Sequence, residues 1–199
     1  MPHFWFIRHG QATHNVDAII RGEHAYFDPV NTDAALTDVG HGQAQAARDL
    51  IPEDLNAIYC SPSRRCRQTL LGAAAVQAEA IGVTLDDRLM EPQGDALCNK
   101  RIDRATLASI VSNNWTLNSV AEENPFQTWV GEGYSCGSNG YQKFAARVRD
   151  FTEEILMYHG PKDQILIVSH HDWIRTWFST HMGQNVSPDN CAVLTAYLA

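Results

Sequence analysis

Short continuous runs of large apolar residues recur along the chain, and each one predicts a buried β-strand. The clearest runs cover residues 4–7 and 164–169, and shorter ones cover residues 57–60, 83–85 and 191–198. Apolar runs of this length are typical of strands that are covered on both faces, as in a parallel sheet. We therefore expect five strands, the first of them beginning near residue 3.

Between these runs, apolar residues recur at helical spacing, and capping residues bound the segments. Thr37 is suited to an N-cap, Pro52 ends the segment that Thr37 opens, and Gly82 and Gly160 close two longer segments. The expected helices cover residues 37–51, 64–81, 103–112, 139–159 and a segment from about 172. Strands that alternate with helices predict an α/β fold, here one three-layer α/β/α domain over residues 1–199 with a mostly parallel central sheet.

Two segments carry turn formers without a sustained period. Residues 16–36 are rich in Asp, Asn and Pro and predict a long loop. Residues 92–137 are irregular apart from one short helix, and they contain Trp115 and Trp129. We expect the segment at about 92–137 to form a loop-rich lid that these tryptophans pack.

Polar residues of one kind of chemistry follow four of the apolar segments. Arg8 and His9 follow the first, Glu91 the third and His170 the longest, and the second is followed by Ser61 and then Arg64, Arg65 and Arg67. In parallel sheets the carboxyl ends of the strands meet at one edge, where ligands bind. A histidine there can attack phosphorus while a guanidinium holds the phosphoryl oxygens in a fork. Free amides at the helix start beside His170 also favour an anion.

Five motifs in chain order resemble those of the histidine phosphatase superfamily, the phosphoglycerate mutase-like proteins. They read RHGQATHN at residues 8–15, DAALTDVG with QA at 33–44, SPSRRCRQT at 61–69, LME at 89–91 and VSHHDWIR at 168–175. The segment after Glu91 lacks the tryptophan-containing pattern of the bacterial and glycolytic branches, so the chain looks more like the eukaryotic-type broad branch. His171 stands where this family usually has glycine.

The resemblance implies a mechanism with a covalent phosphohistidine. His9 would be the nucleophile, with its second ring nitrogen donating to a backbone carbonyl that fixes the tautomer. Glu91 would protonate the leaving oxygen and then deprotonate the water that hydrolyses the phosphohistidine. No metal and no cofactor are needed in this scheme, because the arginines and an imidazolium neutralise the phosphoryl charge.

The same resemblance implies a phosphate-binding set. His170 is expected beside the phosphoryl group as a third catalytic residue, together with Arg8 and Arg65. Asn15, Arg21 and the rim residue His171 complete the expected phosphate and substrate contacts. The other polar residues near these motifs are expected in solvated, loop or packing roles, namely Arg64, Arg67, Lys100, Arg101, His14, His24, His41, His159 and Cys66.

Composition narrows the choice of partners and compartment. The formal net charge of −8 argues against general binding to nucleic acids or anionic membranes, although a local arginine cluster can still hold an anionic substrate. The five cysteines are odd in number and show no CxxC spacing, which favours the cytoplasm over a disulfide framework. We expect no signal peptide before the first strand and no membrane-spanning segment.

The favoured function is hydrolysis of a phosphomonoester, on a phosphorylated small molecule or a phosphoprotein. A phosphoglycerate-type phosphomutase is the alternative, but it usually has a longer insertion than the 78 residues between Glu91 and His170. A non-catalytic phosphoprotein-binding module is a third reading, disfavoured because all the core residues are present. A histidine metal site is a fourth, without HxH or HExxH spacing to support it. The physiological substrate and the oligomeric state stay open at this level.

Overall fold

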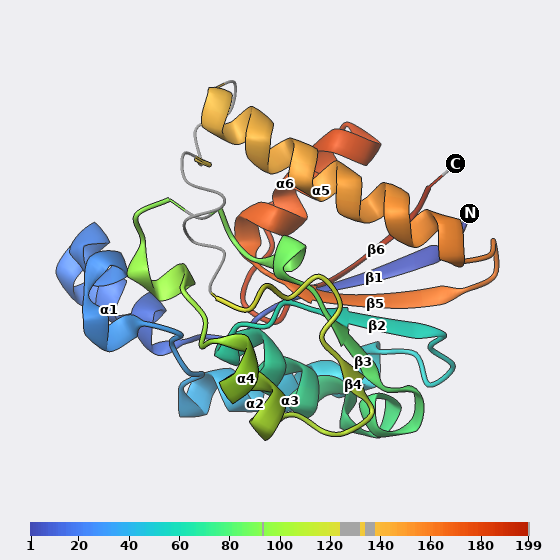
Figure 1. Ribbon diagram of the computed structural model, residues 1–199, viewed down its shortest axis with the longest axis horizontal. Helices are drawn as coiled ribbons and strands as arrows, with labels where there is room; N and C mark the ends of the chain where they lie inside the picture. Colours follow the sequence, from blue (N-terminus) through green and yellow to red (C-terminus); the bar gives the residue numbers. More distant parts are fainter. Residues whose placement is uncertain (93, 124–131, 134–137, 199) are drawn as a thin grey trace.

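The computed structural model describes residues 1–92, 94–123, 132–133 and 138–198, and its centre is one mixed sheet (Figure 1). Within these residues the strand order is β4-β3-β2-β5-β1-β6. The strands are β1 (His3–Arg8), β2 (Ala57–Cys60), β3 (Val83–Leu85), β4 (Trp115–Thr116), β5 (Gln164–Ser169) and β6 (Val193–Tyr197). Only β6, at one edge, runs antiparallel to its neighbour, so the predicted mostly parallel α/β fold is confirmed for the part of the chain described.

Helices cover both faces of the sheet. They are α1 (Thr13–Arg21), α2 (Asp38–Ala46), α3 (Arg64–Ile81), α4 (Arg104–Ile110), α5 (Asn139–Tyr158) and α6 (His171–Met182). Figure 1 shows α5 and α6 on one side of the sheet and α2, α3 and α4 on the other. Each expected helix is present, with Thr37 capping α2 by accepting from the Gly40 amide at 3.1 Å.

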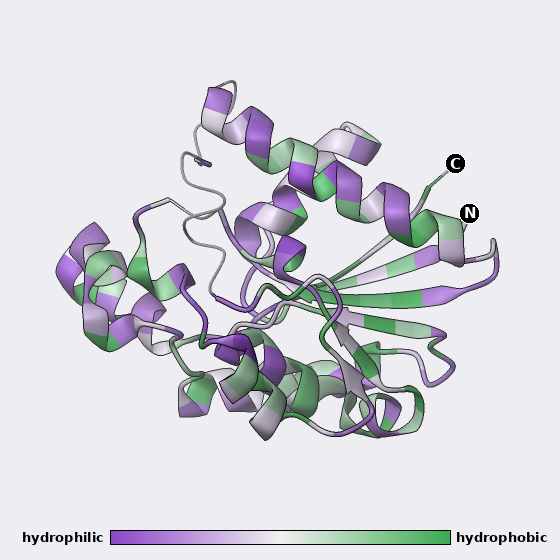
Figure 2. Cartoon of the chain, viewed as in Figure 1, coloured by the Kyte–Doolittle hydropathy of each residue, from purple (hydrophilic) through white to green (hydrophobic). Residues whose placement is uncertain are grey.

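The continuous apolar runs are explained by burial of both strand faces. Along β1, Phe4 and Phe6 pack into the core beneath α5 and α6, whereas Ile7 packs into the core beneath α2 and α3. In β5, Ile165 and Ile167 face the first of these cores. Figure 2 shows hydrophobic strands between helices whose outer faces are polar. No described helix combines the length and apolar character needed to cross a membrane.

The register of three adjacent strands brings the candidate chemistry together. Arg8 at the end of β1 pairs with Ser169 at the end of β5, and Cys60 at the end of β2 pairs with Val168. The residues that follow each strand therefore leave the sheet at the same edge. His9 and His170 are the first residues beyond β1 and β5, so they become neighbours across this edge.

The prediction of a long loop over residues 16–36 is wrong. Most of this segment is helical, in α1 and in the 3₁₀ helices η1 (Gly22–Phe27) and η2 (Pro29–Asn31). Side chains stabilise these short turns: Asn15 accepts from the Ala12 amide at the start of α1, and Asp28 accepts from the Val30 amide in η2. In Figure 1 this unit projects beyond the carboxyl edge of the sheet.

The segment expected to form a lid is built differently in its described part. Trp115 is only 8% exposed and lies in β4, where it packs into the core beneath α3 instead of a lid. Trp129 lies outside the described residues. The segment also contains a short 3₁₀ helix, η5 (Leu97–Asn99), which lies against the α1–η2 unit.

The sequence predicted a solvated face for Arg101, but the structure buries this residue. Its side chain is fully buried and forms a two-point ion pair with Asp87 of the 3₁₀ helix η4 (Asp87–Leu89), at 2.6 and 2.7 Å. The same guanidinium donates to the carbonyl oxygens of Ile102 and Ala121. This pair ties the segment after residue 92 to the end of β3.

We predict that Asp87→Ala lowers the free energy of unfolding by about 3–5 kcal/mol, because the Arg101 cation stays buried after its carboxylate is removed. Denaturant unfolding of the purified variant measures the change. Glu122→Ala is the matched control. Glu122 pairs with Arg104 but is 79% exposed, so about 0–1 kcal/mol should be lost. Equal losses in the two variants would contradict a structural role for the buried pair.

Candidate active site

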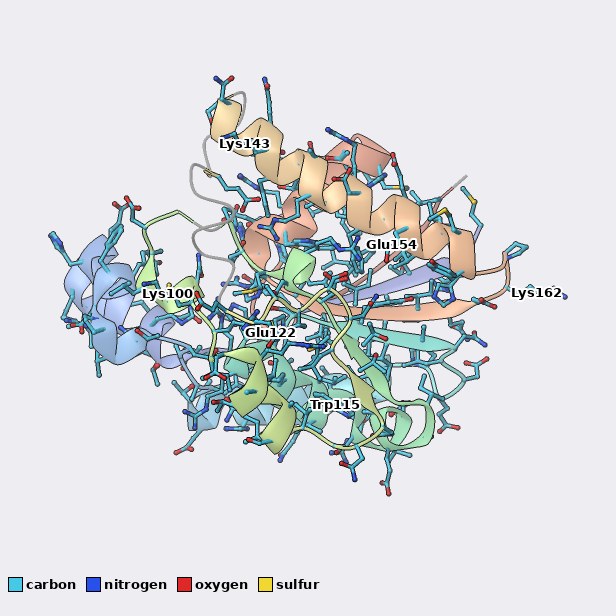
Figure 3. All side chains as sticks on the ribbon, in the orientation of Figure 1. Lys100, Trp115, Glu122, Lys143, Glu154 and Lys162 are labelled. Atoms are coloured by element: carbon cyan, nitrogen blue, oxygen red, sulfur yellow. The ribbon has the colours of Figure 1, made fainter. Side chains whose placement is uncertain are left out.

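A cavity of about 450 Å³ opens at the carboxyl edge of the sheet. Its walls come from the end of β1, the segment after η4, the starts of α1, α3 and α6, and the two 3₁₀ helices η1 and η5. The lining residues are Arg8, His9, His14, Asn15, Glu23, Tyr26, Phe27, Arg65, Glu91, Ala96, Cys98, Asn99, His171 and Asp172. By contrast, Lys162 lies at the opposite, N-terminal end of β5 (Figure 3).

His9 is held in one tautomer at the cavity wall. Its Nδ1 lies 2.8 Å from the Gly10 carbonyl oxygen, which can only accept, so Nδ1 carries the proton and Nε2 keeps its lone pair. This confirms the expected backbone contact. Burial, and then the charge of Arg65, hold the pKa of His9 well below its ordinary value. The ring is therefore neutral, with the lone pair of Nε2 available.

The glycine after His9 is required by close packing. A Cβ on Gly10 would lie 2.7 Å from the Gly40 carbonyl oxygen, closer than real Cβ contacts allow. The Gly10 amide donates to the Thr69 hydroxyl of α3 at 2.9 Å. The turn that presents His9 is thus packed between α2 and α3.

His170 lies beside His9, with a ring-centroid distance of 5.2 Å, but it is fully buried and does not belong to the described cavity lining. Arg65 Nη2 lies 3.1 Å from its Nδ1. A guanidinium only donates, so Nδ1 accepts and Nε2–H donates to the Ser61 hydroxyl at 2.9 Å.

The resemblance implies an imidazolium at His170, whereas in this geometry its Nδ1 accepts from Arg65. Burial, followed by the charge of Arg65, holds the pKa of His170 well below its ordinary value. His170 is therefore neutral, and its visible contact is with the arginine that lines the cavity. His170 therefore lies next to the site, but Arg65, and not His170, belongs to the described cavity lining.

Two guanidinium groups lie at the His9 end of the cavity. Arg65, in the first turn of α3, is 1% exposed and donates to the Cys98 carbonyl and the Asn99 side chain at 2.8 and 3.2 Å. Arg8 donates to the Pro188 carbonyl at 2.9 Å. The Nε atoms of both arginines are buried without a hydrogen-bond partner in the described structure. Oriented, partly unsatisfied cations of this kind suit an oxyanion.

Glu91 supplies a buried carboxyl group to the same cavity. Its Oε1 accepts from the Asp172 amide at the start of α6 at 3.2 Å, and its own carbonyl accepts from Arg147 at 3.2 Å. Burial, followed by the nearby Asp172 carboxylate, raises the pKa of Glu91 to about 7. Near neutral pH both its protonated and ionised forms are populated, as a general acid and base requires.

Asn15 and His171 line the cavity as expected, but Arg21 does not. The Arg21 guanidinium is bound at 2.7 Å by both Asp17 and Asp28 on the exposed side of α1. His171 lies 3.1 Å from the Ser187 hydroxyl and 3.3 Å from the Asp172 carboxylate. Arg21 ends α1, and its two ion pairs hold the guanidinium outside the described cavity lining.

Of the neighbouring arginines of α3, Arg64 is exposed as expected, whereas Arg67 is not on a solvated face. Arg67 Nε donates to the Pro62 carbonyl at 2.9 Å, and its guanidinium lies 3.8 Å from Asp33. Neither belongs to the described cavity lining. Arg67 therefore bonds to the turn that precedes α3 and Arg65.

Sequence reasoning missed several lining residues. Glu23, Tyr26 and Phe27 come from η1, and Cys98 and Asn99 from η5. The signal that could have identified η1 is the adjacent pair Tyr26-Phe27 within an otherwise polar stretch, because aromatic side chains need cover. Within the described residues, no group of three or more His, Cys, Asp or Glu side chains is arranged to hold a metal ion.

The chain belongs to the histidine phosphatase superfamily (branch 1), whose family model matches residues 4–194. Phosphoserine phosphatase 1 of Hydrogenobacter thermophilus is 27% identical over 180 residues, which cover 85% of this chain and 77% of that protein.

Solved structures share the fold. A phosphoserine phosphatase from Entamoeba histolytica, in complex with 3-phosphoglyceric acid, aligns with a TM-score of 0.60 at 20% identity, over 98% of this chain and 90% of that one. A mycobacterial glucosyl-3-phosphoglycerate phosphatase aligns with a TM-score of 0.61 at 18% identity, over 98% and 92%. The family assignment supports a phosphatase that acts on phosphomonoesters.

The raised pKa of Glu91 predicts a pH-dependent cost in stability. The folded protein holds this proton to about pH 7, whereas the unfolded chain releases it near 4.5. The bound proton of Glu91 therefore contributes fully to the free energy of unfolding below pH 4.5. This contribution, on the order of 3 kcal/mol, is lost as the pH rises to 7. Glu91→Gln removes the titration, so the stability of the variant relative to the wild type should rise from pH 5 to pH 8.

Thermal or denaturant unfolding at both pH values measures this difference. Glu23→Gln is the control, because it removes an exposed carboxyl group from the same cavity. A relative stability of Glu91→Gln that does not change with pH would contradict the assigned titration.

Proposed function

We propose that this protein hydrolyses a phosphomonoester through a phosphohistidine on His9, with Glu91 as the general acid and base. The observation that carries the proposal is the state of His9: neutral, with Nε2 available, beside two guanidinium groups. A neutral imidazole is the form that can attack phosphorus, and the cations can hold the three phosphoryl oxygens.

In the first step, His9 Nε2 forms a bond to phosphorus as the ester oxygen leaves. The electron pair of the broken P–O bond stays on the leaving oxygen, which takes the proton of Glu91. Arg8 and Arg65 bind the phosphoryl oxygens, and Asn15 is proposed as a further contact. The His9 Nδ1–H, bonded to the Gly10 carbonyl, keeps the ring oriented while positive charge develops on it.

In the second step, Glu91, now ionised, takes a proton from a water molecule that attacks phosphorus. The N–P bond breaks, its electron pair returns to Nε2, and inorganic phosphate leaves. Glu91 ends protonated, as it began. A pKa of about 7 is suited to both proton transfers, because the protonated and the ionised forms of Glu91 are both populated near neutral pH.

Charge in the cavity favours hydrolysis over a phosphomutase, which has to bind two anionic groups. In the described lining, the cationic residues are Arg8 and Arg65, and both charges act on His9. The carboxylates of Glu23 and Asp172 in the same lining would repel a second anion. We therefore propose a small phosphomonoester as substrate. The two cations alone would also suit a module that only binds phosphate. The buried carboxyl group of Glu91, a candidate proton donor, favours hydrolysis over such a module.

We assign this activity to the cytoplasm. The support is the chemistry of cysteine: Cys60, Cys66, Cys98 and Cys191 are buried free thiols. A reducing compartment keeps such thiols unpaired.

We predict that His9→Ala lowers kcat for p-nitrophenyl phosphate by several orders of magnitude, because the nucleophile is deleted. Phosphate release without added metal measures the rate, and rapid acid-free quenching followed by mass spectrometry should find a phosphoryl adduct on His9 of the wild type only. His41→Ala, an exposed histidine of α2, is the matched control and should keep full activity. Substantial activity in His9→Ala, or loss on chelation with recovery on adding zinc, would reject the proposal.

Glu91→Gln should affect poor leaving groups most. A nitrophenolate leaves without a proton, whereas an alkoxide needs one, so kcat for an alkyl phosphate should fall about tenfold or more beyond the fall for the nitrophenyl ester. Steady-state kinetics on the two esters give the ratio. Equal losses would show that Glu91 is not the acid for the leaving oxygen.

A further inference from the structure

His14 is a buried histidine of the cavity wall that the mechanism above does not use. It is the second residue of α1 and is 5% exposed. Its ring centroid lies 5.9 Å from that of His9 and 6.1 Å from that of Tyr26. It therefore faces the His9 end of the cavity, near the two guanidinium groups.

The hydrogen bonds of Asn15 determine the tautomer of His14. Asn15 Oδ1 accepts from the Ala12 amide at 2.9 Å, which assigns the oxygen and nitrogen of this side-chain amide. The amide nitrogen, Nδ2, lies 3.1 Å from His14 Nε2. An amide nitrogen only donates, so Nε2 of the ring accepts and Nδ1 carries the proton.

This Nδ1–H group is buried without a hydrogen-bond partner in the described structure. Burial, followed by the charges of Arg65 and Arg8, lowers the pKa of His14 to about 2, so the ring is a neutral donor. Buried donors are seldom left unpaired, and one on a side chain that lines a binding cavity is suited to an acceptor on the ligand.

We propose that His14 Nδ1–H donates a hydrogen bond to a phosphoryl oxygen of the substrate. This inference rests on the proposed function, since it names one more contact of the same site. His14 would add a neutral donor to the cations Arg8 and Arg65. Its acceptor nitrogen would at the same time hold Asn15 in place.

Two substitutions separate the nitrogen atoms of the ring. The amide of Asn lies where Nδ1 lies in histidine, whereas the amide of Gln reaches the place of Nε2. His14→Asn therefore keeps a donor for the substrate, and His14→Gln keeps an acceptor for Asn15. The competitive inhibition constant of inorganic phosphate should stay within about threefold of the wild-type value in His14→Asn and rise about tenfold or more in His14→Gln.

The pair His24→Asn and His24→Gln is the matched control, because His24 is exposed in η1 and both variants should behave as the wild type. The opposite order, with His14→Gln closer to the wild type, would mean that the ring serves Asn15 alone. Equal constants for the two variants would mean that it only fills space. Either result, in a wild-type enzyme that hydrolyses phosphomonoesters, overturns this inference and leaves the proposed function standing.

Long-range ¹H–¹⁵N NMR of the wild type tests the same contact without a variant that has to fold. The His14 Nδ1 should show the shift of a protonated ring nitrogen, and it should move when inorganic phosphate is added. An unprotonated Nδ1, or a signal that phosphate does not move, overturns the inference. Absence of both phosphate binding and hydrolysis in the wild type would overturn the proposed function together with it.

Discussion

The parallel pairing of β1 with β5 is the constraint on which the site depends. These strands are separated by more than 150 residues in the sequence, yet Arg8 lies opposite Ser169 in the register. That register makes His9 and His170 neighbours and places the start of α6 beside Glu91. A slip of one residue would turn every side chain of β5 to the other face of the sheet. Two apolar cores, one on each face, therefore hold the chemistry in place.

Burial of charge at this edge decides the protonation of the whole site. Burial, followed by the charge of the almost fully enclosed Arg65, lowers the pKa of His9, His14 and His170. The three imidazoles are consequently neutral, and each has a defined tautomer. Glu91 is shifted in the opposite sense, toward its protonated form, because its burial is reinforced by the Asp172 carboxylate. The site thus combines fixed cations with neutral donors and one carboxyl group that can change state near pH 7.

Much of the fold and the main reactive residues could be predicted from the sequence. The strands at 57–60, 83–85 and 164–169 and the helix at 64–81 have the predicted bounds, because apolar runs and caps are local signals. His9 and Glu91 could be identified because each follows such a strand, whereas Arg65 was chosen among three neighbouring arginines by its motif. The segment 16–36 was misjudged, since the side-chain caps by Asn15 and Asp28 stabilise helical turns that turn-forming composition hides.

The sequence by itself determined the chemistry that depends on neighbours along the chain. The contact of His9 with the Gly10 carbonyl, and therefore the tautomer protonated at Nδ1, is a matter of adjacent residues. Only the tertiary structure decided which polar residues are buried and what they meet. It placed Arg21 outside the cavity and Arg101 in an ion pair, and it placed His170 behind Arg65, because burial and long-range hydrogen bonds arise from contacts between segments that are far apart in the chain.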